Sequence, residues 1–481
     1  MVTSMIIRTT KDLGAAVKAR PSTKRRSPEA KARSTSTPSS LGLEPMAEDT
    51  LILLLDGETI GSVHRRAGRL SLIYSDEWRR RPDAYPLSLS MPLAAAQHPH
   101  GPVNAFLWGL LPDNDVVIER WARHFQVSPK NPFALIGAVG EDCAGAVQFV
   151  RPDRVELYLK GADDKIDWLD SEQVAERLRA LREDQAAWRF ARDTGQFSLA
   201  GAQPKTALMF EDGRWGVPSG RVPTTHILKP PSVDFDGHAE NEHLCLLLAR
   251  RLGLPAAQSR VERFNNEIAI VVERYDRLRL GSRVARVHQE DFCQALAYLP
   301  TDKYQNEGGP GISECVAALS DHSSSPTQDI DTFLDAVVFN WIVVGTDAHA
   351  KNYSLLIASE GRARLAPLYD IASALPYSGL DFQKLKMAMK MGGEYRVRDI
   401  DARHIGRMAA EARQSPGRTV ERAHELASAA PNAVRTVADE MKASGLTHEI
   451  IDRLAVQIAE RAVRLQARLA AWRPEQHAPR E

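Results

Sequence analysis

Thr346-Asp347-Ala348-His349-Ala350-Lys351-Asn352 is the stretch that decides the fold, together with Leu368-Tyr369-Asp370-Ile371-Ala372. The first aspartate precedes the asparagine by five residues, and the second aspartate follows that asparagine by eighteen. Carboxylate and amide oxygens of this kind hold a divalent cation against phosphate groups. A loop aspartate can also accept the proton of an incoming hydroxyl. The alternative is that Asp347 and Asn352 only cap and turn the backbone, as most loop Asp and Asn residues do.

The flanking sequence places this loop between a helix and a hairpin. Residues 333–345 are mostly apolar and long enough for a buried helix that stops at Gly345. Residues 353–357 and 363–366 predict two strands. A helix, an Asp-x-x-x-x-Asn loop, a hairpin and a further Asp occur in this order in the C-lobe of protein kinases.

Composition and length predict a soluble protein of two to four domains. The chain has 481 residues, 43% hydrophobic and 26% charged, with a formal net charge of zero. It contains no apolar run of about 18 residues and no secretion signal, so we expect a cytoplasmic protein without a membrane span. The scattered cysteines predict reduced thiols rather than a metal site.

The first 45 residues form a region of different character. They carry nine Lys or Arg against three Asp or Glu and a Ser/Thr/Pro-rich stretch. Such a composition cannot build a core, so residues 1–45 are predicted to be a disordered basic tail. The folded part is expected to begin near Asp49, and Met46 is an alternative start.

Residues 46–150 predict a small α+β module without a catalytic constellation of its own. A hairpin signal, Asp56-Gly57, stands between its first two strands. Expected strands span 50–56, 58–63, 69–74 and 144–150, and expected helices span 103–111, 115–126 and 132–138.

Residues 197–210 predict a strand, a loop of small residues and a second strand, after a connecting helix at 171–190. Ala200, Gly201 and Ala202 allow backbone N–H groups to approach phosphate oxygens, and Lys205 adds a cation. The alternative is a tight turn with a surface lysine, because neither a Walker A nor a GxGxxG pattern is present.

A strand at 225–230 carries Lys229, which would meet nucleotide phosphates. Glu240 and Glu242 lie in the first turn of an expected helix at 239–252, and either could pair with Lys229 or simply favour the helix N-terminus. An apolar strand at 268–275 then predicts either the hinge between two lobes or a core strand with a charged end.

Taken together, these elements stand in the serial order of a bilobal kinase. The chain resembles the HipA-type serine/threonine kinases, which are toxins of bacterial toxin–antitoxin modules. The resemblance covers roughly residues 50–470. It lies in Phe106-Leu-Trp-Gly-Leu-Leu-Pro-Asp113, Ser198-Leu-Ala-Gly-Ala-Gln-Pro-Lys-Thr-Ala-Leu208, Thr225-His-Ile-Leu-Lys229, Val271-Val-Glu-Arg-Tyr-Asp-Arg277, His288-Gln-Glu-Asp-Phe-Cys-Gln-Ala-Leu296 and the two opening stretches.

The resemblance implies a role for each matching residue. Asp347 would be the catalytic base, and Asn352 and Asp370 would hold Mg²⁺. The ATP site would comprise Ala200, Gly201, Ala202, Gln203, Pro204, Lys205, Lys229, Glu273, Arg274, Tyr275, His349, Ala350, Lys351, Asn352, Tyr369 and Asp370. Ser198 would be the autophosphorylated serine. Pro204 departs from the acidic residue that many members carry, and it removes one backbone N–H from the loop.

The resemblance also implies the architecture and the partners. The expected fold is α+β and bilobal, with a HipA N-terminal subdomain at 46–150, a kinase N-lobe at 151–277 and a mainly helical C-lobe at 278–475. ATP and Mg²⁺ are the implied cofactors. The implied partners are a helix-turn-helix antitoxin similar to HipB and, through the antitoxin complex, DNA. A protein substrate is also implied, and an aminoacyl-tRNA synthetase is one such substrate in this family. A corepressor with a kinase fold and a small-molecule kinase stay open as alternatives.

Overall fold

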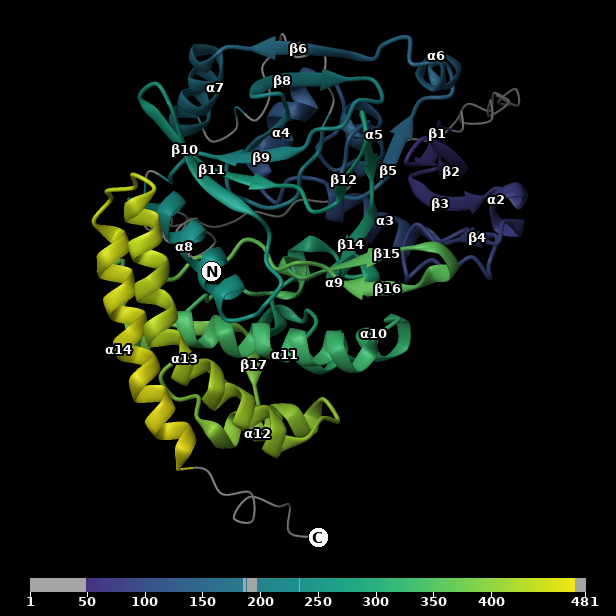
Figure 1. The fold of residues 1–481 in the computed structure, drawn as a ribbon. Coiled ribbons are helices and arrows are strands. Elements are labelled where there is room, and N and C mark those ends of the chain that lie inside the picture. The colour runs from purple at the N-terminus through teal and green to yellow at the C-terminus, as the bar shows by residue number, and fades with distance from the viewer. Residues whose placement is uncertain (1–48, 185–186, 188–196, 233, 472–481) are drawn as a thin grey trace, which may run out of the picture.

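The computed structural model describes residues 49–184, 187, 197–232 and 234–471. The basic tail predicted for residues 1–45 therefore lies outside the described residues. Figure 1 shows sheets and short helices in one half of the molecule and packed long helices in the other. Within the described segments, no helix combines the length and apolar character needed to cross a bilayer.

The N-terminal module is a five-stranded sheet covered by helices. Its strands are β1 (Asp49–Leu55), β2 (Glu58–Arg66), β3 (Arg69–Tyr74), β4 (Gln97–His98) and β5 (Val147–Val150), in the order β4-β3-β2-β1-β5. Its helices are α2 (Asp76–Arg80), α3 (His100–Leu110), α4 (Asp115–His124) and α5 (Pro132–Val139). Asp56 and Gly57 both have positive φ, 46° and 89°, as the predicted hairpin turn requires.

A six-stranded antiparallel sheet follows, in the order β10-β11-β9-β7-β8-β6. The elements of this region are α6 (Val155–Leu159), β6 (Lys165–Leu169), α7 (Ser171–Glu183), β7 (Thr206–Glu211), β8 (Arg214–Ser219), β9 (His226–Lys229), α8 (His238–Arg251), β10 (Ser259–Phe264) and β11 (Glu267–Glu273). Val174 and Leu178 of α7 pack on Leu208 and Leu228 of the sheet, so this apolar helix face closes a core of its own.

Two sequence-based expectations fail in this region. The helix predicted for 171–190 ends at Glu183, where Asp184 is its C-cap. The strand predicted to begin at Phe197 is a single bridge to Asp142, and the Ser198 N–H donates to the Asp142 carbonyl at 3.0 Å. The segment before β7 therefore pairs with the N-terminal module instead of extending the sheet.

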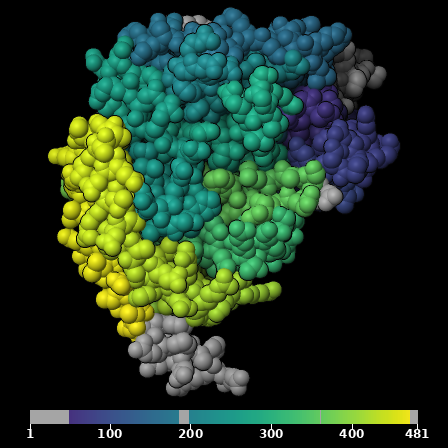
Figure 2. Space-filling view, in the orientation of Figure 1, coloured from purple at the N-terminus to yellow at the C-terminus, as the bar shows by residue number. Residues whose placement is uncertain are grey.

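The helical lobe completes the chain. Its small strands are β12 (Arg277–Leu280), β13 (Arg283–Arg286), β14 (His288–Asp291), β15 (Ser354–Ile357), β16 (Ala363–Leu365), β17 (Lys386–Met391) and β18 (Glu394–Arg396). Its helices are α9 (Phe292–Ala295), α10 (Ile312–His322), α11 (Pro326–Val343), α12 (Ala402–Glu411), α13 (Pro416–Ala443) and α14 (Ile450–Ala470). Figure 2 shows α13 and α14 (yellow) as a continuous strip along one side of the molecule.

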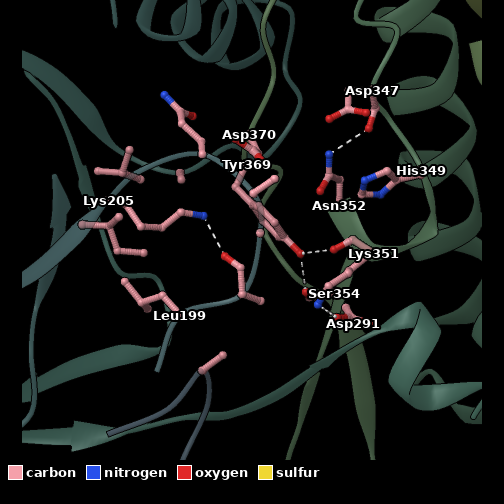
Figure 3. Close-up of a pocket in the computed structure, with 18 of the residues that line it drawn as sticks. Leu199, Lys205, Asp291, Asp347, His349, Lys351, Asn352, Ser354, Tyr369 and Asp370 are labelled. Atoms are coloured by element: carbon pink, nitrogen blue, oxygen red, sulfur yellow. Dashed lines mark hydrogen bonds and ion pairs between the residues drawn. The ribbon is translucent and has the colours of Figure 1, made fainter. Parts of the chain in front are cut away.

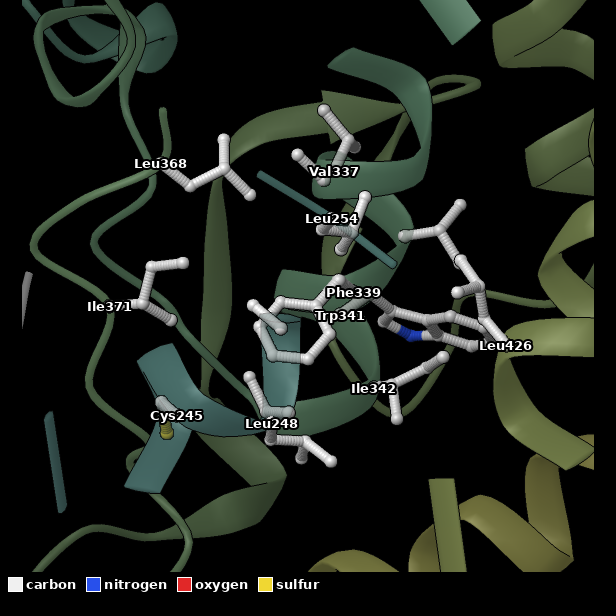
Figure 4. Packing of buried hydrophobic residues seen from close by; sticks show 14 of the residues in the cluster. Cys245, Leu248, Leu254, Val337, Phe339, Trp341, Ile342, Leu368, Ile371 and Leu426 are labelled. Atoms are coloured by element: carbon white, nitrogen blue, oxygen red, sulfur yellow. The ribbon is translucent and has the colours of Figure 1, made fainter. Parts of the chain in front are cut away.

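Helix α11 is the buried axis of this lobe. Trp341, Phe339 and Ile342 are fully buried, and they pack with Leu248 of α8 and Leu426 of α13 in one apolar cluster (Figure 4). A helix that is apolar on all sides is stable only inside such a core. The end of α11 is consequently fixed in space, and the next residues start from a rigid support.

The end of α11 differs by one residue from the prediction. Val344, with φ of 60°, is the left-handed C-cap, and Gly345 follows it. Gly345 is required for a different reason, because a Cβ there would collide with the side chain of Asn340. Its N–H donates to the Asn340 carbonyl at 2.7 Å. The chain thus turns sharply into the loop that carries Asp347.

Candidate active site

One cavity of about 210 Å³ lies where the N-terminal module, the six-stranded sheet and the helical lobe meet. Figure 3 shows Lys205 on one side of this cavity and Asp347, Asn352 and His349 on the other. Three parts of the chain that are distant in sequence therefore share one pocket.

The catalytic loop predicted from the sequence is held by its own hydrogen bonds. The Asn352 side-chain amide donates to the Asp347 backbone carbonyl at 2.8 Å, and the His349 N–H donates to the same carbonyl at 2.8 Å. Burial lowers the pKa of His349 to about 3, so its ring is neutral at ordinary pH. Both Asp347 and Asn352 face the cavity, as predicted.

Lys229 lies between two carboxylates. Its Nζ is 2.8 Å from Glu242 Oε1 and 2.7 Å from Asp370 Oδ1. The structure thus selects Glu242, not Glu240, as the glutamate partner that the sequence left open. Burial opposes the charge of Asp370, but Lys229 and Lys205 hold the pKa of that carboxyl well below its ordinary value. Asp370 is therefore an anion in the cavity.

The predicted phosphate loop leads from the Phe197 bridge into β7. Lys205 Nζ donates to the Ala200 carbonyl at 2.7 Å, and burial lowers the pKa of Lys205 to about 8. Gly201 has φ of 101°, and a Cβ there would lie 2.6 Å from Lys205 Nζ. Gln203 and Ala202 also line the cavity, whereas Pro204 is not among the lining residues.

The part of the cavity expected to bind adenine is formed by the end of β11 and the residues that follow it. Glu273, Arg274 and Tyr275 all line the cavity, and the rings of Tyr275 and Tyr369 lie 5.8 Å apart. The Tyr369 hydroxyl donates to the Lys351 carbonyl at 3.1 Å, which ties this wall to the catalytic loop.

Arg274 contributes to this wall differently from its neighbours. Its guanidinium lies in a buried ion-pair cluster, 2.8 Å from Asp276 and 3.5 Å from Asp142 of the N-terminal module. The Arg274 side chain therefore fastens the hinge to the module. Ala350, like Pro204, is not among the residues that line the cavity, because it is fully buried in the apolar core.

Two family models match the chain over the parts that form this cavity. The model of the HipA N-terminal domain matches residues 51–150, and that of the HipA-like C-terminal domain matches residues 197–441. The chain belongs to the HipA family. The resemblance drawn from its motifs is thereby confirmed.

Relatives of this HipA-family chain carry kinase names. It is 35% identical over 411 residues to the protein named "Putative kinase Y4mE" of Sinorhizobium fredii, covering 85% of this chain and 96% of that protein. It is 31% identical over 387 residues to "Serine/threonine-protein kinase toxin HipA" of Shewanella oneidensis, covering 76% of this chain and 82% of the toxin.

A solved structure confirms the expected kinase-like α+β fold. It is the complex of Shewanella oneidensis HipA with HipB and operator DNA, and the match has a TM-score of 0.76 at 25% identity. The superposition covers 90% of this chain and all of the matched chain (100%).

The donor set of this HipA-family site fits a magnesium ion shared with phosphates. Asn352 Oδ1 and the second carboxylate oxygen of Asp370 have no hydrogen-bond partner among the described residues. The described part of the chain has no group of three or more His, Cys, Asp or Glu that could cage a metal. Mg²⁺ suits such a site, since it takes one or two protein oxygens and completes its shell with water and phosphate.

Sequence reasoning missed several residues that line the cavity. They include Asp113, His238, Asp291, Lys303 and Tyr304. Asp113 stands at the end of a quoted family motif, and this position was the one signal available for it. Asp291 likewise stands in a quoted stretch, residues 288–296. His238, Lys303 and Tyr304 carry no local pattern, because only the tertiary fold brings them to the site.

Proposed function

We propose that this HipA-family protein is an ATP-dependent serine/threonine kinase that acts as a toxin on a protein substrate. One observation carries the proposal: Asp347, Asn352 and the Lys229–Asp370 pair face a single cavity. We further propose residues 46–150, 151–277 and 278–475 as its N-terminal subdomain, N-lobe and C-lobe.

The arrangement supports in-line phosphoryl transfer. Asp347 would orient the acceptor hydroxyl and take its proton. Backbone N–H groups of residues 200–203 and the ammonium groups of Lys205 and Lys229 would hold the ATP phosphates. Mg²⁺, bound by Asn352 and Asp370, would neutralise charge on the phosphate oxygens. Tyr275, Tyr369 and the backbone after β11 would enclose adenine.

Ser198 is the proposed site of autophosphorylation. Its side chain is fully buried, and its hydroxyl donates to the Leu110 carbonyl at 2.8 Å. A dianionic phosphate cannot occupy this position, so phosphorylation requires the segment to leave the N-terminal module. Because Gly201 is bonded to the same module through the Asp113 N–H at 3.0 Å, the phosphate loop would be displaced too. Modification of Ser198 would thereby silence the kinase.

We propose a HipB-like helix-turn-helix antitoxin as the partner, with DNA contacted through that complex. The match to HipA in its complex with HipB and operator DNA supports this proposal. An aminoacyl-tRNA synthetase is the substrate class that we would test first.

A γ-labelled ATP transfer assay tests the function. Wild type is expected to label itself, Asp347→Asn to transfer no label, and Ser198→Ala to lose its own label while still labelling a protein target. Equal labelling of wild type and Asp347→Asn would remove Asp347 as the base. A wild type that binds MgATP without transferring phosphate to any synthetase or to itself would leave the corepressor as the better proposal.

A further inference from the structure

Lys303 and Tyr304 lie beside the catalytic base without a role in the mechanism above. They connect two short 3-10 turns, Pro300–Asp302 and Gln305–Glu307, and both line the cavity. The Tyr304 hydroxyl donates to Asp347 Oδ1 at 2.7 Å, and Lys303 Nζ lies 5.6 Å from the centre of the Tyr304 ring. The Lys303 ammonium and the Asp347 carboxylate also attract each other electrostatically.

Lys303 is fixed in this position by the N-terminal module. Its Nζ is 2.7 Å from Oδ2 of Asp113, which is 7% exposed and follows α3. Burial opposes the charge of Lys303, but Asp113 and then Asp347 raise its pKa above the ordinary value. Asp113 also lies 3.8 Å from Lys351 Nζ and donates its N–H to Gly201. One residue of the module thus supports Lys303 and the catalytic loop through its carboxylate, and the phosphate loop through its backbone N–H.

Two other lysines of the cavity, Lys229 and Lys351, are more fully engaged by protein oxygens. Lys229 lies between Glu242 and Asp370, and its side chain is 7% exposed. Lys351 donates to the Gly109 carbonyl at 2.7 Å and to Asp291 at 3.2 Å, and it is 3% exposed. Lys303 has one carboxylate partner among the described residues and is 13% exposed. Since an ammonium has three N–H donors, Lys303 keeps donors for an incoming anion.

We propose that Lys303 is a further catalytic residue, which donates to the phosphoryl group as it moves from ATP to the acceptor hydroxyl. Asp113 and Tyr304 are positioning residues, acting through Lys303 and Asp347 respectively. The inference rests on the proposed kinase function. In the step, the acceptor oxygen forms a bond to the γ-phosphorus as the bond from that phosphorus to the β,γ-bridging oxygen breaks. ADP leaves with the electron pair of that bond, the hydroxyl proton passes to Asp347, and Lys303 stays protonated.

The role of Lys303 differs in kind from that of Lys205 and Lys229. Those two lysines hold phosphates in the ground state as well, so their loss weakens ATP binding. A donor used mainly while the phosphoryl group is in transit affects kcat and leaves binding nearly unchanged. Loss of one such donor costs about 100-fold or more in rate.

The test compares four full-length variants with wild type. Self-labelling by γ-labelled ATP is measured in single turnover, and MgATP affinity is measured by calorimetry. Lys303→Met should label itself at least tenfold more slowly with MgATP affinity within threefold of wild type. Lys303→Arg should recover at least half of the lost self-labelling rate on a logarithmic scale. The self-labelling rate of Asp113→Asn should lie between those of Lys303→Met and wild type. Lys130→Met, at an exposed lysine of the N-terminal module, is the control that should change neither value.

The outcomes separate this inference from the function on which it rests. A Lys303→Met rate less than tenfold below wild type overturns the inference and leaves the kinase intact. The inference is also overturned if Lys303→Met loses both rate and MgATP binding and Lys303→Arg restores neither, because the lysine is then structural. A wild type that binds MgATP but never labels itself contradicts the proposed function first, and the role of Lys303 falls with it.

Discussion

The side-chain amide of Asn352 donates a hydrogen bond to the backbone carbonyl of Asp347 at 2.8 Å. Because the amide nitrogen of Asn352 is used in this bond, its amide oxygen is the atom left to bind Mg²⁺. The same bond also stabilises the loop that carries the proposed base. One asparagine therefore joins the metal site to the proton-accepting site. An aspartate at the same place could supply an oxygen but could not donate to the carbonyl.

Asn352→Ala and Asn352→Asp should separate these two tasks. Both are expected to lower kcat by about 100-fold, because both lose the brace at a site that needs close positioning. Only the alanine variant should also need several times more Mg²⁺ for half-maximal rate, since it alone loses the oxygen ligand. Magnesium titrations of phosphate transfer measure this difference. Identical magnesium requirements in the two variants would argue against Asn352 as a ligand.

Lys229→Met should destabilise the fold as well as abolish ATP binding. It leaves Glu242, whose side chain is 1% exposed, without its cation, and breaking such a buried pair costs about 3–5 kcal/mol. The double variant Lys229→Met/Glu242→Leu removes both charges and should regain most of that stability while staying inactive. Denaturant unfolding of both variants measures the recovery. If the double variant is as unstable as the single one, the unpaired carboxylate is not the cause.

Gly201→Ala should weaken nucleotide binding more than it weakens the fold. The new Cβ would lie 2.6 Å from Lys205 Nζ and displace the ammonium from the Ala200 carbonyl. Gly213→Ala is a matched control, because Gly213 also has positive φ but has open space around it. Both should lose about 1–2 kcal/mol of stability through backbone strain. Only Gly201→Ala is expected to lose about tenfold in MgATP affinity, which calorimetry measures. If the two variants bind MgATP with equal affinity, the loop does not contact the phosphates.

Lys205 should make nucleotide binding depend on pH above neutrality. Burial lowers its pKa to about 8, so the free protein loses this cation as pH rises through that value. MgATP affinity should therefore fall between pH 7 and 9, and Lys205→Arg, which keeps its charge there, should flatten the fall. The effect of Lys205 on folding stability has the opposite sign. Between its lowered pKa in the folded protein and its ordinary pKa in the unfolded chain, the unfolded chain binds more protons, so stability rises with pH in that range. Affinity of the wild type that is constant from pH 7 to 9 would contradict the assignment.

The residues that sequence reasoning found are those whose spacing is set by chemistry. Asp347, Asn352 and Asp370 stand on one short stretch of chain, and protein kinases carry these residue types in this order. Lys229 was found because a strand that ends on a lysine after a small-residue loop is a local pattern. The motif therefore predicted the centre of the site.

The remainder depends on tertiary contacts that leave no local trace. Asp113 and Lys303 are 190 residues apart, and nothing in either segment predicts that they pair. Glu240 lies in the first turn of α8 and Glu242 follows two residues later, so the two side chains point in different directions around the helix. Only the packing of α8 against the sheet selects Glu242. The loop before β7 was misassigned because its partner, Asp142, lies in the N-terminal module.

Arg461 of α14 should control the loop of Asp347 from outside the cavity. It is 6% exposed, and its guanidinium donates to the Trp341 and Ile342 carbonyls, each at 3.1 Å. Both carbonyls belong to the last turn of α11, where helix carbonyls are short of backbone donors. The Trp341 carbonyl also accepts the Val344 N–H, but only at 3.4 Å. Arg461 thus caps the helix from which the catalytic loop departs.

Arg461→Met should therefore lower both stability and phosphate transfer. Loss of two buried charge-assisted hydrogen bonds predicts about 2–4 kcal/mol of destabilisation. Amide exchange at residues 344–347 should accelerate, and kcat should fall because the base is less well fixed. Arg464→Met is the control, since that arginine is on the same helix, is 68% exposed and has a 3.8 Å contact with Glu460. An Arg461 variant with reduced stability but unchanged exchange at 344–347 and unchanged kcat would show that the cap supports the lobe without reaching the base.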